Sequence, residues 1–193
     1  MRRGDRIVSS DEIDRIAHQR ALQQKQQEEQ ARQDQGRQFV DHLQACVQEI
    51  GEETPILLRL LAERGYPNIV EVRVEEASPN LIARLFGGRS LAKGGWHIGG
   101  FEWYEHERSS GRVKVYLLSD GRIYADGWRT HAYSPQAILG LMHSAWGPAY
   151  ILHAAREGIS YSPLARRGSP GPADILHAAR EGIRQLRREL EAR

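Results

Sequence analysis

The stretch that decides the fold runs from Gly111 to Trp128 and reads GRVKVYLLSDGRIYADGW. Two runs rich in β-branched and aromatic residues flank Asp120-Gly121, which predicts a β-hairpin. A three-residue loop, with glycine in the left-handed position, pairs Leu117 with Ile123. A two-residue loop would instead place Asp126 on the apolar face of the hairpin. Because a slip of one residue inverts every face, the hydrophobic pattern selects the three-residue loop.

The selected register gives the hairpin a second face that carries aromatic and basic side chains. It sets Lys114 opposite Asp126, a cross-strand ion pair worth about 0.2–1 kcal/mol. Such a face can stack unpaired nucleic-acid bases, can bind a protein through its Tyr, Trp and Arg side chains, or can be covered by a second layer of the same chain. The predicted binding residues are Tyr116, Tyr124, Arg112, Arg122, Lys114 and Trp103.

Two further strands are predicted on the N-terminal side of the hairpin. In residues 68–76, NIVEVRVEE, valines alternate with charged residues, as in a half-buried strand. The stretch KGGWHIGGFEWYEHE, residues 93–107, reads as a strand interrupted by glycine pairs, which predict a bulge or a close backbone approach. Residues 78–88 between them read as a short helix or turn.

Helical patterns flank the strands. Phe39 and the apolar residues that follow it repeat on one helix face, and Gly51 is expected to end that helix. Thr54-Pro55 is expected to begin a separate, buried helix, and Ser134-Pro135 another. These elements predict an α+β fold, with a mostly antiparallel sheet of about four strands and helices packed on one face.

Three regions follow from this pattern: a polar helical arm over residues 1–37, the α+β domain over 38–150, and a partly duplicated helical tail over 151–193. The tail is called partly duplicated because it repeats a phrase of the sequence. Residues Gly147–Ile159 read GPAYILHAAREGI and residues Gly171–Ile183 read GPADILHAAREGI, so the two copies differ only at Tyr150 and Asp174. We interpret the repeat as a partial tandem duplication. Only one copy is expected to pack on the sheet, with the other peripheral.

Composition narrows the class of protein. A net charge of +2 argues against a protein built to coat nucleic acid or an anionic membrane. The chain shows no signal peptide and no apolar run that could span a membrane, which predicts a cytoplasmic protein. The single cysteine, Cys46, excludes an intramolecular disulfide and reads as a small buried hydrophobe. The paired histidines of the repeat, His153 and His177, read as surface residues.

Histidines and glutamates are frequent in residues 96–107, but their spacing does not suit a metal site. On a regular strand His97 and Glu105 lie about 26 Å apart, too far to share a metal ion, and Glu102 lies on the opposite face. No catalytic motif, phosphate loop, metal ligand set or cofactor signature is recognised. The sequence therefore favours a non-catalytic protein-binding or adaptor module with an unknown protein partner. The alternatives are an RNA- or single-stranded-DNA-binding protein that uses the aromatic-basic face, and a small enzyme centred on residues 96–107.

Overall fold

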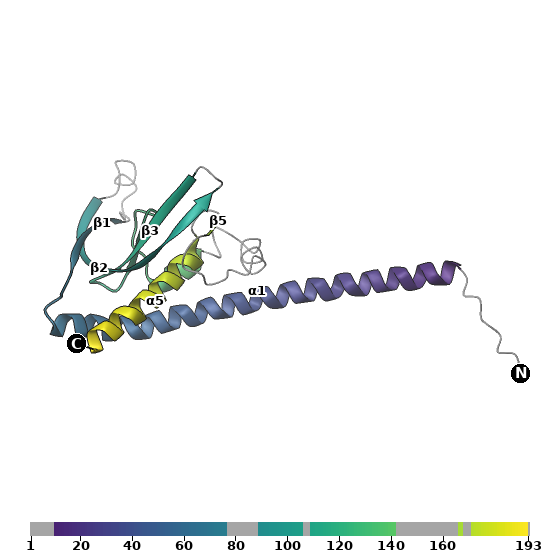
Figure 1. Ribbon diagram of the computed structural model, residues 1–193, viewed down its shortest axis with the longest axis horizontal. Coiled ribbons are helices and arrows are strands. Elements are labelled where there is room, and N and C mark those ends of the chain that lie inside the picture. The colour runs from purple at the N-terminus through teal and green to yellow at the C-terminus, as the bar shows by residue number, and fades with distance from the viewer. Residues whose placement is uncertain (1–9, 77–88, 106–108, 142–165, 168–170, 193) are drawn as a thin grey trace, which may run out of the picture.

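A computed structural model of the chain describes residues 10–76, 89–105, 109–141, 166–167 and 171–192 (Figure 1). Within these residues the fold is α+β, as predicted. The helices are α1 (Ser10–Glu63), α3 (Pro135–Leu141) and α5 (Pro172–Glu191). The strands are β1 (Val70–Glu76), β2 (Arg89–Glu105), β3 (Ser109–Leu118), β4 (Ile123–Asp126) and β5 (Arg166–Arg167). The antiparallel order is β1-β2-β3-β4, and β5 pairs with β2 in parallel.

The β3–β4 hairpin has the predicted register. Leu117 pairs with Ile123, and Lys114 stands opposite Asp126. The turn is closed by the Gly121 backbone N–H, which donates to the Leu118 carbonyl at 2.9 Å. Gly121 has φ +81°, the left-handed conformation that the three-residue loop requires. The apolar face of the hairpin is buried against the helices, so the hydrophobic pattern did select the register.

Strand β2 contains the bulge that its glycines predict. Its pairing with β3 shifts between His97 and Gly99, so the alternation of faces is interrupted there. Phe101 is consequently buried on the helix side, while His97 and Glu102 both emerge on the other side of the sheet. The expectation that His97 and Glu102 lie on opposite faces was wrong, because it assumed a regular strand.

Helix α1 is one continuous element, so the prediction that Gly51 ends a helix and Thr54-Pro55 begins another was wrong. Pro55 has no N–H for the Gly51 carbonyl, which weakens the helix locally. Packing overrides this loss, because Ile50 and Leu57 lie seven residues apart on one helix face and both are fully buried in the same core.

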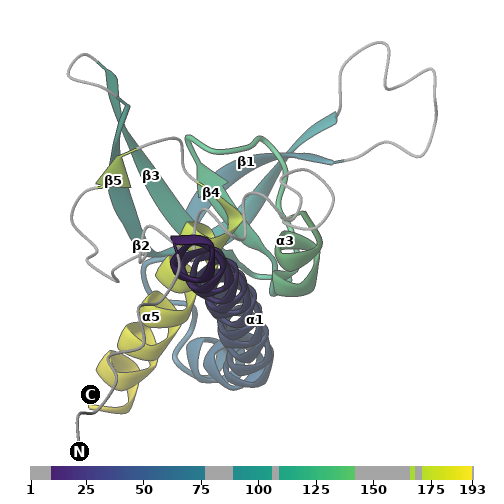
Figure 2. The same cartoon turned by 90° about the vertical axis from the view of Figure 1, so that its right-hand side faces the viewer.

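Helix α5 begins with the second copy of the repeat and packs against α1 and against β2, with both helices on the same side of the sheet (Figures 1 and 2). Its apolar face is buried in the main core, in which Ile175 and Ile183 are at most 1% exposed. Gly182 faces β2 so closely that a Cβ atom there would lie 1.8 Å from the Ile98 carbonyl oxygen. The first copy and residues 78–88 lie outside the described residues, so the expectation that only one copy packs on the sheet stays a prediction.

One sequence difference between the two copies has a structural role at the start of α5. The Gly171 backbone N–H donates to the Asp174 carboxylate at 3.0 Å, and Asp174 is buried. An acidic side chain in the first turn also suits the positive end of the helix dipole. A tyrosine, which the first copy carries at this position, has no carboxylate to make this bond.

The face of the sheet away from the helices has a small apolar cluster of its own, formed by Val72, Val74 and Leu118. Residues 130–133 connect the outer strands, because the Glu75 N–H donates to the Thr130 carbonyl and Ile123 exchanges backbone bonds with Tyr133. None of the described helices is long and apolar enough to cross a bilayer.

Candidate metal centre

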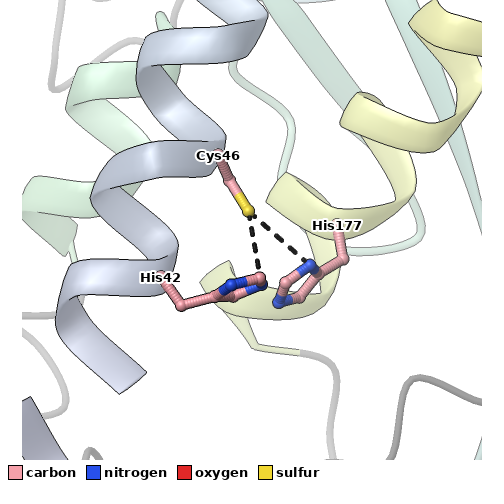
Figure 3. Close-up of side chains that lie close together, drawn as sticks. All are labelled: His42, Cys46 and His177. Atoms are coloured by element: carbon pink, nitrogen blue, oxygen red, sulfur yellow. Dashed lines mark hydrogen bonds between the residues drawn. The ribbon is translucent and has the colours of Figure 1, made fainter. Parts of the chain in front are cut away.

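Three side chains with metal-binding atoms meet where α1 packs on α5 (Figure 3). His42 and Cys46 are four residues apart on α1 and therefore share one helix face, while His177 comes from the second turn of α5. The Cys46 Sγ atom lies 3.7 Å from His42 Nε2 and 3.9 Å from His177 Nδ1. One ligand atom from each residue fits within a mutual separation of 4.8 Å. The imidazole rings of His42 and His177 stack, with centroids 5.2 Å apart.

The site is enclosed by protein. Cys46 is 0% exposed and His177 is 7% exposed, while His42 lies at the rim. Burial raises the pKa of the Cys46 thiol, although the nearby Arg180 guanidinium opposes that shift. Burial and the Arg180 charge both lower the pKa of His42. This shift favours the neutral imidazole, the form that coordinates a metal.

Arg180 is the cation closest to the thiol. Its Nη1 donates to Cys46 Sγ at 3.1 Å, and its Nη2 lies 3.1 Å from the Glu181 carboxylate. Arg184 is likewise paired with Glu49 across the α1–α5 contact. The cations around the thiol therefore have carboxylate partners, which limits their repulsion of a further positive charge.

The arrangement is better suited to a ligand set than to a nucleophile. A nucleophilic cysteine needs an exposed sulfur whose pKa is lowered, and Cys46 is buried with a raised pKa. A metal ion, in contrast, displaces the thiol proton to solvent and bonds the thiolate directly. One thiolate and two imidazoles are donors that borderline and soft transition metals prefer.

Sequence reasoning missed this constellation. The prediction that His177 is a surface residue was wrong, because α5 carries it into the core. Cys46 is buried as expected. A histidine four residues before a cysteine on a predicted helix was the one local signal available, and the third ligand is 131 residues further along the chain. His153 lies outside the part of the chain that the structure describes.

Beside this centre, α5 and β2 enclose a cavity of about 470 Å³. Ile98 and Phe101 supply apolar walls from β2, and His177, Arg180 and Gln185 border the cavity from α5. His177 thus belongs both to the three-residue cluster and to the cavity wall. His42 and Cys46 are not among the residues that line the cavity.

The predicted binding residues of the hairpin lie on the sheet face away from the helices, as its register requires. Tyr116 and Tyr124 are neighbours with ring centroids 6.2 Å apart, and both are half-buried against the Val72, Val74 and Leu118 cluster. Burial raises the pKa of both phenols. The tyrosine rings are therefore partly used in packing, rather than standing free as an open stacking platform.

The basic residues of that face stand close to carboxylates. Arg122 binds Asp120 at 2.8 Å and Glu76 at 3.3 Å, and Lys93 bridges the same two acids. Lys114 stands opposite Asp126, and the exposed Arg112 stands opposite Glu102. Of the predicted set, Trp103 belongs to β2, but its side chain lies outside the described parts of the chain.

The residues of the enzyme hypothesis are spread along the sheet. His97 pairs with Tyr116, and Glu102 pairs with Arg112. Since those partners are four residues apart on β3, His97 and Glu102 are separated by about 13 Å along the strand. The His97 and Tyr116 rings instead meet in an edge-to-face arrangement, with centroids 5.4 Å apart. His97 borders a small pocket with Trp96 and Leu190, and Glu102 is not among the residues that line it.

Comparison with known proteins matched no family model, no curated protein and no solved structure. The functional proposals therefore rest on the geometry of the described residues.

Proposed function

We propose that this chain is a non-catalytic protein-binding or adaptor module of the cytoplasm, and that the N-terminal part of α1 is its main contact element. The observation that carries the proposal is the exposure of residues 15–35. Each of these residues is exposed, and Figure 1 shows this part of α1 extending well beyond the sheet and α5. At 1.5 Å per residue, the exposed segment is about 30 Å long.

A projecting helix of this kind offers a large surface to another polypeptide. Helical stability in proteins comes mostly from tertiary packing, yet residues 15–35 have little packing within the described chain. Local bonds such as that from Gln24 to Glu28 contribute only a few tenths of a kcal/mol. Ile16 and Leu22 are 42% and 47% exposed and would be covered by a partner. A bound protein would supply the packing that the segment lacks.

Charge supports a protein partner over nucleic acid. Residues 15–35 contain four basic residues, Arg15, Arg20, Lys25 and Arg32, and three acidic ones, Glu28, Glu29 and Asp34, so their net charge is only +1. The basic residues of the hairpin face stand opposite or bind carboxylates. A surface that binds phosphates needs cations that are free to replace counterions.

Site-specific photocrosslinking tests the proposal. A photoreactive amino acid at Leu22 should give a discrete protein adduct in living cells, and the same group at Arg188, an exposed position of α5, should not. The double variant Ile16→Gln and Leu22→Gln, with the crosslinker moved to Gln19, should lose the adduct if apolar contact contributes. Equal, diffuse crosslinking at both positions would contradict the proposal.

A second measurement separates the nucleic-acid alternative. Anisotropy of a fluorescent single-stranded oligonucleotide should show no binding at low salt. Binding that weakens steeply with salt, and is lost on Arg112→Ala, would instead support nucleic acid as the partner.

A further inference from the structure

We propose that His42, Cys46 and His177 form a zinc(II) site that joins α1 to α5. The site goes beyond the protein-binding role, because it lies in the core between two helices, away from the exposed segment of α1. Three independent properties carry the inference: the spacing of the donor atoms, the chemistry of the donors, and their enclosure in the core.

The Cys46 sulfur already has nearly the spacing from both histidine nitrogens that a zinc ion imposes. Zn–N bonds of about 2.05 Å and a Zn–S bond of about 2.3 Å at tetrahedral angles place sulfur and nitrogen about 3.6 Å apart. The Cys46 Sγ atom is 3.7 Å from His42 Nε2 and 3.9 Å from His177 Nδ1. The sulfur therefore needs to shift by only a few tenths of an ångström relative to either nitrogen. The three donor atoms lie within 4.8 Å of one another, so on coordination the two nitrogens would also close to the roughly 3.3 Å that a tetrahedral site sets between them.

The donor set is one that zinc uses. Two imidazoles and one thiolate make three protein ligands, and zinc sites with three protein ligands keep a fourth position for water or another small ligand. His42 is only partly buried, and His177 also borders the cavity of about 470 Å³, so the site has one ligand at its rim and another beside a cavity. A site that zinc loads after folding needs an entry path, and the rim at His42 is the side that supplies it.

The surroundings suit a bound thiolate. The Arg180 guanidinium donates to Cys46 Sγ at 3.1 Å, a hydrogen bond that a metal-bound thiolate accepts better than a neutral thiol does. Groups outside the ligand set often orient metal ligands in this way. The Glu181 carboxylate holds Arg180 at the same time.

The decisive experiment is a zinc titration of the full chain, purified with a histidine-free tag and stripped of metal. A chromophoric chelator competes for the ion, and one zinc per chain is expected. Cobalt(II) then reports on the ligands, because a thiolate bound to cobalt adds charge-transfer absorption in the near ultraviolet. Cys46→Ser should abolish that absorption, and His42→Gln should weaken zinc binding by at least about 10-fold.

Matched controls keep the result interpretable. His18→Gln removes an exposed histidine from the same helix and should leave zinc binding unchanged. His42 lies at the rim of the core, so His42→Gln should preserve folding even if a variant at the buried His177 does not; circular dichroism of each variant checks this. Failure to bind zinc, or binding that Cys46→Ser and His42→Gln leave unchanged, would overturn the proposal.

Discussion

Replacing Gly182 with alanine tests the close packing of α5 on β2. The new Cβ atom would lie 1.8 Å from the Ile98 carbonyl oxygen and 2.6 Å from its carbonyl carbon, so the helix must move by roughly 1.5 Å to restore normal contact. Ile98 lies in the bulge of β2, but His97 and Gly99 on either side of it pair with β3, so its backbone has less freedom to move away than a flexible side chain has. Overpacking of this kind costs up to about 3 kcal/mol, while alanine favours a helix over glycine by about 1 kcal/mol. We expect a net loss of about 2 kcal/mol.

Urea denaturation followed by circular dichroism measures this loss, with a chelator present so that bound metal does not contribute. Gly51→Ala is the matched control. Gly51 is an exposed residue inside α1, and nothing lies within 4 Å of the Cβ position. That variant should gain about 1 kcal/mol from helix propensity alone. If Gly182→Ala were stabilised to the same extent as Gly51→Ala, the inferred contact between α5 and β2 would be refuted.

The remaining predictions concern two carboxylates. Burial alone would raise the pKa of Asp120, but hydrogen bonds from Arg122 and Lys93 outweigh it and lower the pKa to about 2. Asp120→Asn should therefore lower the free energy of unfolding by about 1 kcal/mol above pH 4, a value kept small because the carboxylate is about one-third exposed. In urea denaturation the difference from wild type should vanish as the pH falls to about 2, and a difference that stays constant with pH would contradict the ion pairs. Asp174→Tyr makes the two repeat copies identical. It should lower the free energy of unfolding by about 1 kcal/mol or more, because it removes the hydrogen bond to Gly171 and a favourable charge at the start of α5. Thermal unfolding measures this loss, and an unchanged midpoint would contradict the role of Asp174.

Local patterns predicted the sheet well because the information is local. The register of the hairpin follows from Asp120-Gly121 and from the alternation on either side, and the observed pairing of Leu117 with Ile123 agrees. The bulge in β2 could be anticipated from its glycines, but its effect on Glu102 could not, because its position sets which face every later residue takes. The helix break predicted from Gly51 and Pro55 was wrong because the deciding information is not local. Packing of the whole helix on the core outweighs two residues that are unfavourable in a helix.

The candidate metal centre could not be read from the sequence, because it depends on how two distant helices meet. The four-residue spacing of His42 and Cys46 fixes two donors on one face of α1, yet nothing local assigns the third. His177 belongs to a repeated phrase with an identical partner at His153, and sequence alone does not say which copy enters the core. The use of the hairpin residues Tyr116 and Tyr124 in binding stays a prediction.

The single-helix character of α1 has a mechanical consequence. The exposed segment and the buried segment share one backbone, so the buried segment acts as a pivot and the exposed one as a lever of about 30 Å. A tilt of about 5° at the pivot would move the far end by roughly 3 Å. His42 and Cys46 lie near the start of the buried segment. Small changes in the packing of α5 on α1 would therefore move the N-terminal end of α1 by a distance comparable to the size of a side chain.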